Sequence, residues 1–146
     1  MKMSQYETVD TLETVSLIEN LRAVTDWAER LWLETFGSRD RLEGMLLCIE
    51  EAFVNLCHHG YRGRPGPVRL ECLKDRSGFI VYRILDWSEA FDITQLSQPD
   101  TTSGLGMRPI GGLGVMLMKE MADEVEWRLE NDANALSLKF NLNNPE

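Results

Sequence analysis

The stretch LEGMLLCIEEAFVNLCHHG, residues 42–60, decides more of the fold than any other part of this sequence. Its apolar residues recur at helical spacing and occupy a wide sector of the predicted helix: Leu42, Met45, Leu46, Ile49, Ala52, Phe53 and Leu56. A sector this wide predicts a helix that is packed over much of its surface. We expect Ser38 or Asp40 to cap the first turn and Gly60 to end the helix.

A second amphipathic helix is predicted just upstream, ending near Gly37, where glycine can take the left-handed conformation that closes a helix. Asn20 is expected to be its N-cap. The apolar positions recur at spacings of three, four and one: Leu21, Val24, Trp27, Ala28, Leu31 and Trp32. Before this helix, residues 9–18 carry an irregular apolar pattern that fits a strand.

Two strands are predicted after the loop that follows Gly60. The first covers residues 68–73, and residues 75–78 form a turn. The second covers residues 79–85 and is apolar on both faces, which indicates a central, covered place in a sheet. Residues 86–110 are polar and interrupted by glycine and proline, and loops of this length are commonly lids or binding loops.

The C-terminal part predicts a short helix and a closing hairpin. The helix covers residues 114–121, and the strands 125–130 and 136–140 flank a turn at residues 131–134. The order of helices, strands, a loop and helix, then strands predicts an α/β (α+β) two-layer sandwich. We expect a mixed, mostly antiparallel sheet covered by helices on one face.

Length, charge and apolar content limit what the protein can be. The 146 residues predict a single domain, 1–146. A formal net charge of −9 argues against a nucleic-acid partner, because such partners normally require a basic patch. The sequence shows no apolar run near the roughly 20 residues of a membrane helix, so no membrane association is expected. Its start also lacks the pattern of a signal peptide, so a cytoplasmic location is the default expectation.

The first candidate site residues are Glu51 and Asn55, which lie four residues apart and therefore on one face of the predicted helix. An Asn side-chain oxygen suits a hard cation such as Mg²⁺. A carboxylate one turn away can take a proton from a hydroxyl group that attacks phosphorus. This spacing is common, and it equally fits residues that are solvated or that make capping contacts.

Two further elements could meet a nucleotide. The glycine turn at residues 111–114 precedes an apolar helix, whose free N–H groups and positive dipole end favour phosphate. A turn onto a helix without any ligand has the same pattern. Asp86 ends a hydrophobic strand, where its carboxylate can accept a hydrogen bond from an exocyclic amine such as that of adenine. A turn-initiating Asp is the alternative.

Taken together and in order, these elements resemble the motifs of a known family. IEEAFVN at residues 49–55, with HGY at 59–61, resembles its N box; Asp86 with Phe91 and Asp92 resembles its G1 box; GLG at 112–114 resembles its G2 box, and MADEV at 121–125 the segment that follows. The family is that of the anti-sigma-factor serine kinases, within the superfamily of gyrase-type, chaperone and histidine-kinase ATPases (the Bergerat fold). The similarity extends from about residue 20 to residue 140.

The resemblance implies a histidine-kinase-like ATPase fold and a role for each matching residue. Glu51 would be the general base that activates a target serine, and Asn55 would hold Mg²⁺ with ATP. Asp86 would read the adenine amine, and residues 94–110 would form the ATP lid. The residues that the resemblance assigns to nucleotide binding are Asn55, Asp86, Ser88, Arg108, Gly111, Gly112, Leu113 and Gly114.

The same resemblance implies protein partners. A kinase of this family would phosphorylate a small anti-anti-sigma-type (STAS) protein and bind a sigma factor or an analogous regulator, and family members are commonly homodimers. One departure concerns Ser88 and Ala90, which stand where the G1 box usually has glycines. A Cβ forced to positive φ there would cost about 1 kcal/mol.

Two other functions therefore stay open. One is a non-catalytic partner-switching module that retains the fold, with or without the nucleotide. The other is the ATPase half of a histidine kinase, which is disfavoured because no segment resembles a dimerisation helix that carries a phosphoacceptor His.

Overall fold

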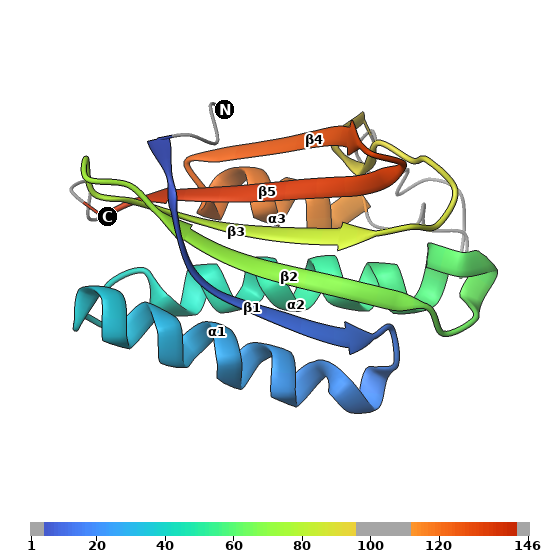
Figure 1. The fold of residues 1–146 in the computed structure, drawn as a ribbon, viewed down its shortest axis with the longest axis horizontal. Coiled ribbons are helices and arrows are strands. Elements are labelled where there is room, and N and C mark those ends of the chain that lie inside the picture. The colour runs from blue at the N-terminus through green and yellow to red at the C-terminus, as the bar shows by residue number, and fades with distance from the viewer. Residues whose placement is uncertain (1–4, 96–111, 143–146) are drawn as a thin grey trace.

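The computed structural model describes residues 5–95 and 112–142, which form one antiparallel sheet and a layer of helices (Figure 1). In chain order the elements are β1 (Glu7–Val15), η2 (Ile18–Asn20), α1 (Leu21–Phe36), α2 (Leu42–His59), η3 (Gly60–Gly63), β2 (Pro67–Lys74), β3 (Phe79–Asp86), η4 (Ile93–Gln95), α3 (Gly112–Met121), β4 (Glu124–Glu130) and β5 (Ala133–Asn141). The η elements are short 3₁₀ helices. No helix in these two described ranges is long and apolar enough to cross a membrane.

The strand order in the sheet is β1-β2-β3-β5-β4, which makes β3 the central strand, as its apolar pattern predicted. Each pairing in this sheet is antiparallel, so the prediction of a mixed sheet was too broad. Short turns join β2 to β3 and β4 to β5, and a short turn can join only antiparallel neighbours. The pairs β1–β2 and β3–β5 are antiparallel as well, although helices separate them in the sequence.

The three α-helices lie on one face of the sheet, and the core lies between the two layers (Figure 1). Alternate residues of β3 point to the helices, and Tyr82 among them donates a hydrogen bond of 2.7 Å to the Ala28 carbonyl of α1. Helix α2 buries a wide sector of its surface, which confirms the wide apolar sector seen in the sequence: Leu42, Met45, Cys48, Ile49, Ala52, Phe53 and Cys57. The two-layer α+β architecture is therefore confirmed.

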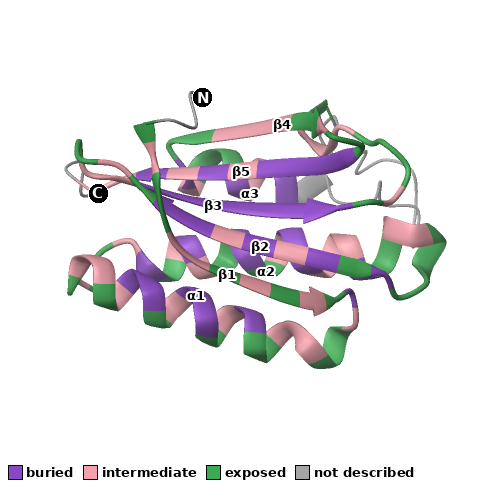
Figure 2. Ribbon diagram, viewed as in Figure 1, coloured by how far each residue is buried: buried purple, intermediate pink, exposed green. Residues whose placement is uncertain are grey.

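Strand β3 is buried on both faces even though the helices cover only one (Figure 2). On the face away from the helices, Arg83 is 4% exposed. Its guanidinium donates to Glu71 of β2 at 2.7 Å and also to Glu130 at the end of β4. Neighbouring strands therefore cover this face through ion-paired side chains instead of a second helical layer.

The predicted helix caps are only partly realised. Asn20 occupies the N-cap position of α1 but makes no capping bond, because its side chain donates to the Val15 carbonyl at 3.0 Å. Gly37 closes α1 in the left-handed conformation, as predicted (φ 64°). For α2 the prediction of Ser38 or Asp40 was wrong. Ser38 Oγ instead accepts a hydrogen bond from the Asp40 N–H, within the connecting loop.

The N-cap of α2 is Arg41, in the left-handed conformation (φ 61°) and without a side-chain cap. Its guanidinium reaches across to the C-terminal end of α3, where it donates to Asp123 Oδ2 at 2.8 Å and to the Met121 carbonyl at 2.8 Å. The Arg41 side chain is 9% exposed. The Arg41 side chain, which only donates hydrogen bonds, therefore caps the C-terminal end of α3, and it gives the first N–H groups of α2 no side-chain cap.

The closing hairpin is tighter than predicted, because β5 begins at Ala133 and not at Leu136. Its loop is the residue pair Asn131 and Asp132, both with positive φ (49° and 69°). A two-residue loop of this kind is a type I′ turn, which matches the twist of the flanking strands.

Replacing Asp132 by glycine should raise the free energy of unfolding by about 0.5–1 kcal/mol, because glycine adopts positive φ without a Cβ clash. Urea denaturation of wild type and Asp132→Gly measures the difference. The matched variant Asp132→Ala keeps a Cβ and should be less stable than wild type. If Asp132→Gly were less stable than wild type, the positive φ of Asp132 would not be a source of strain in this turn.

Candidate functional site

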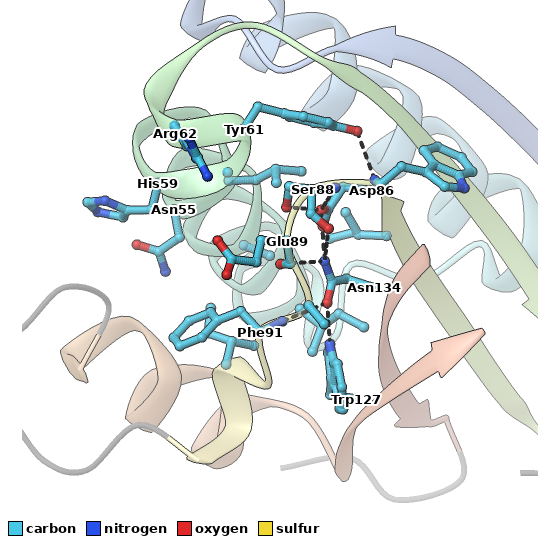
Figure 3. Close-up of a pocket in the computed structure, with 18 of the residues that line it drawn as sticks. Asn55, His59, Tyr61, Arg62, Asp86, Ser88, Glu89, Phe91, Trp127 and Asn134 are labelled. Atoms are coloured by element: carbon cyan, nitrogen blue, oxygen red, sulfur yellow. Dashed lines mark hydrogen bonds between the residues drawn. The ribbon is translucent and has the colours of Figure 1, made fainter. Parts of the chain in front are cut away.

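A pocket of about 1070 Å³ lies between the C-terminal half of α2, η3, the end of β3 and the segment that follows it (Figure 3). Trp127 of β4 and Asn134 and Leu136 of β5 complete its wall. The volume is slightly above the usual range for small-molecule sites, about 300–1,000 Å³. Of the residues predicted to bind the nucleotide, three line this pocket in the described part of the chain: Asn55, Asp86 and Ser88.

Asp86 is 8% exposed and lies at the end of β3, as predicted. Its Oδ1 accepts hydrogen bonds from the Ser88 N–H at 3.0 Å, the Ser88 hydroxyl at 2.5 Å and the Asn134 side-chain amide at 3.1 Å. Within the described ranges, Oδ2 accepts no hydrogen bond. A buried carboxylate with one satisfied oxygen retains acceptor capacity for a ligand.

Ser88 and Ala90 do not carry the backbone strain that glycine-like positions would have imposed on them. The described residues with positive φ include neither of them. The Ser88 hydroxyl donates to Asp86 Oδ1 at 2.5 Å. Serine and alanine at positions where the family usually has glycine therefore leave the loop unstrained, and the Ser88 hydroxyl adds a hydrogen bond to the Asp86 carboxylate.

Glu51 and Asn55 meet the start of α3 at Gly114. A Cβ built on Gly114 would lie 2.5 Å from Glu51 Oε2 and 3.4 Å from Asn55 Nδ2. The three residues that the sequence assigned to different motifs are therefore neighbours. This approach is possible only because residue 114 lacks a side chain.

The Asn55 amide is a buried polar group that is not fully satisfied. Its Nδ2 is buried and has no hydrogen-bond partner among the residues that the structure describes. Such a group costs free energy unless a ligand, an ion or water pairs with it. The unpaired Nδ2 donor of Asn55 therefore suits an acceptor on a polar ligand, such as a phosphate oxygen, whereas a cation would have to bind the side-chain oxygen.

Other predicted site residues lie beside the pocket or outside the described ranges. Glu51 is not one of the described residues that line the pocket, and its carboxylate faces Gly114 next to it. Gly112 and Leu113 begin α3. Arg108, Gly111 and most of the predicted lid, residues 94–110, lie outside the described residues. The first two lid residues belong to η4.

The pocket residues that were not assigned a role from the sequence include Tyr61, Trp127 and Asn134. Asn134 fell within a stretch interpreted only as a turn, and Trp127 within a closing strand. Tyr61 belongs to the HGY motif, which was the one available signal. The Tyr61 hydroxyl donates to the Pro67 carbonyl at 2.6 Å and accepts from the Trp87 N–H at 2.8 Å.

Tyr61 and Arg62 both have positive φ (54° and 58°), which is rare for residues with side chains. The Tyr61 bonds to β2 and to the end of β3 hold this turn, and burial raises the pKa of the hydroxyl. His59 also lines the pocket. Burial, and secondarily the charge of His58, lowers the pKa of the His59 imidazole, which favours its neutral form.

Comparison with known proteins agrees with this arrangement. Residues 14–140 match the family model described as the histidine kinase-like ATPase domain. The chain belongs to the histidine kinase-like ATPase family. It is 31% identical over 145 residues to the serine-protein kinase RsbW of Bacillus pumilus (strain SAFR-032), with 88% of each chain covered. The resemblance to the anti-sigma-factor serine kinases is thereby confirmed.

A second relative is the serine/threonine-protein kinase BtrW of Bordetella bronchiseptica (strain ATCC BAA-588 / NCTC 13252 / RB50), 29% identical over 135 residues. That alignment covers 88% of this chain and 91% of the relative. Among solved structures, the RsbU and RsbW domains of Rv1364c from Mycobacterium tuberculosis superimpose with a TM-score of 0.61 at 15% identity. The match covers 92% of this chain and 33% of that chain, and it supports the fold alone.

Replacing Tyr61 by phenylalanine should lower the free energy of unfolding by about 1 kcal/mol, because two backbone groups lose a hydrogen-bond partner. The Trp87 amide should also exchange its proton faster, because its acceptor is removed. Urea denaturation and amide hydrogen exchange measure the two effects. Unchanged hydrogen exchange at the Trp87 amide would contradict the proposal that the Tyr61 hydroxyl holds this backbone segment.

Proposed function

We propose that this protein is an ATP-dependent protein-serine kinase and an anti-sigma-type regulator. The observation that carries the proposal is the contact of Glu51, Asn55 and Gly114 beside a pocket that contains the buried carboxylate of Asp86. A base, a Mg²⁺ ligand, a glycine at a helix start and an acceptor for an amine are the parts that phosphoryl transfer from ATP requires. The names of the two relatives, both serine or serine/threonine kinases, support it.

The residues present fit ATP and Mg²⁺. Asn55 would hold the cation, which supplies charge neutralisation for the transferring phosphoryl group. Asp86 would accept a hydrogen bond from the exocyclic amine of the base. Gly111 to Gly114 and Arg108 would contact the phosphates. The unsatisfied amide of Asn55 is the structural observation that favours a ligand at this position.

Glu51 would act as the general base. Its carboxylate is one helical turn from Asn55 and is directed at the start of α3. From there it would accept the proton of a substrate serine hydroxyl while the hydroxyl oxygen bonds to phosphorus. Because phosphoryl transfer involves little other covalent chemistry for the protein, its main contribution would be positioning.

The partners we propose follow from the family. The substrate serine would belong to a STAS-domain anti-anti-sigma-type protein, and a sigma factor or an analogous regulator would be the second partner. We also propose that the protein acts as a homodimer in the cytoplasm, and that neither nucleic acid nor membrane is a partner.

A non-catalytic partner-switching module is the second candidate, and one observation favours it. Glu51 does not line the described part of the pocket, and its carboxylate lies against Gly114. Calorimetry with ATP and Mg²⁺ separates the two candidates when it is combined with a phosphorylation assay. Tight nucleotide binding without transfer to any STAS-domain protein would favour the module.

Replacing Glu51 by glutamine should lower phosphorylation of a cognate STAS-domain protein by about 100-fold or more, because the general base is removed. ATP affinity should stay unchanged, since Glu51 lies beside the pocket. The matched control is Glu50→Gln, at the exposed neighbouring position of the same helix. Equal phosphorylation by wild type and Glu51→Gln would remove the base assignment.

Replacing Gly114 by alanine should separate catalysis from stability. The new Cβ would displace the Glu51 carboxylate, and we expect a fall in phosphoryl transfer of about 10-fold or more. The free energy of unfolding should change by less than about 1 kcal/mol, because alanine is the better helix former and the displaced group is the end of a flexible side chain. A phosphorylation assay and urea denaturation of the same variant measure both quantities. Full activity in Gly114→Ala would contradict the proposed position of Glu51.

A further inference from the structure

Asn134 is a buried polar residue at the centre of the pocket wall, 6% exposed (Figure 3). Its side-chain nitrogen lies within hydrogen-bond distance of three acceptors: Asp86 Oδ1 at 3.1 Å, the Ser88 carbonyl at 3.3 Å and the Glu89 carbonyl at 3.3 Å. Its side-chain oxygen accepts from the Phe91 N–H at 3.0 Å and the Trp127 indole N–H at 3.0 Å. This one amide therefore joins β5, β4, the end of β3 and the loop after it.

The orientation of the Asn134 amide is fixed by these partners. Phe91 N–H and Trp127 Nε1–H are donors only, so the atom that faces them must be the oxygen. The nitrogen must then face the Asp86 carboxylate and the two carbonyls. A flipped amide would place like groups together on both sides, so the hydrogen-bond network allows a single orientation.

We infer that Asn134, oriented by Trp127, is a positioning residue for the purine base of the nucleotide. It donates to Oδ1 of Asp86, beside the two Ser88 donors, and so leaves Oδ2 as the carboxylate acceptor for the ligand. Its bonds to the backbone of residues 88–91 hold the loop that forms the adjacent wall. This inference rests on the proposed nucleotide-binding function.

The consequence is selectivity at position 6 of the purine. A carboxylate oxygen that is held in place only accepts hydrogen bonds, so it pairs with a 6-amino group and opposes a 6-oxo group. A single charge-assisted hydrogen bond corresponds to about 10- to 100-fold in affinity. Without the Asn134 amide, the Asp86 side chain and its loop can adopt other rotamers, and part of this preference is lost.

The test compares MgATP with MgITP, which carries oxygen in place of the 6-amino group, by calorimetry on four proteins. These are wild type, Asn134→Ala, Trp127→Phe and the matched control Trp27→Phe. Trp27 also donates its indole N–H to a carboxylate, Asp10 Oδ2 at 3.2 Å, but it lies in α1 and does not line the pocket. Trp127→Phe keeps an aromatic ring in the wall, so it remains informative if Asn134→Ala fails to fold.

We expect wild type and Trp27→Phe to prefer ATP over ITP by the same factor. In Trp127→Phe and Asn134→Ala, ATP affinity should fall about 10-fold and ITP affinity should change little. The ratio of ATP affinity to ITP affinity should therefore be about 10-fold smaller than in wild type. An unchanged ratio in both pocket variants would overturn the inference, including the case in which both affinities fall equally, since that result indicates a loss of packing only.

A second measurement needs no nucleotide. The Phe91 amide donates to Asn134 Oδ1, so its hydrogen exchange should be about 10-fold faster in Asn134→Ala than in wild type or Trp27→Phe. If wild type binds neither nucleotide, the proposed function fails, while Phe91 exchange still decides whether Asn134 holds the loop. Unchanged exchange would show that it does not.

Discussion

The close approach of α3 to α2 is the constraint on which the rest of the structure depends. Two glycines, one from each helix, make it possible. At one end of the contact Gly114 lies against Glu51, and at the other Gly44 lies against Met121, whose Sδ would be 3.2 Å from a Cβ on residue 44. Interhelical distance depends on the side chains at the contact, and at each end a glycine leaves room for a side chain of the other helix.

This close contact explains why α2 can carry polar groups in an otherwise apolar surface. Glu51 and Asn55 lie between the helices and the pocket, where unpaired polar groups are costly. In a wider interface they would be solvated and their geometry would be free. Here the α3 backbone restricts them from one side, while the pocket gives Asn55 access to a ligand. The packing of the two helices therefore sets the geometry of Glu51, Asn55 and Gly114, while the sheet supplies the polar wall with Asp86 and Asn134.

Most of the fold follows from local patterns that the sequence displays directly. The helices, the antiparallel strands and the central place of β3 each follow from a periodicity or from turn residues. The role of Arg41 did not, because its side chain bonds to residues about 80 positions away, Asp123 and Met121 at the end of α3. The burial of Arg83 also depends on ion-pair partners in other strands, Glu71 and Glu130. No local sequence pattern predicts these pairs.

The site shows the same division between local and distant causes. Glu51, Asn55, Asp86 and Gly114 were predictable because each belongs to a recognisable short motif. Asn134 was not, since its importance depends on its register opposite Asp86 in the sheet, 48 residues away. Register is a property of strand pairing and becomes visible only once the strands are placed.

The order of strands also determines how robust the polar wall of the pocket is. Asp86 belongs to β3 and Asn134 to β5, and both strands have a hydrogen-bonded neighbour on each side. Edge strands open most easily in the native state, whereas central strands open only in the larger unfolding events. Fraying of β1 would thus leave the Asp86–Asn134 pair intact, while fraying of β4 would remove only Trp127 from it. The pair that we assign to the purine base therefore lies in the part of the sheet that opens last.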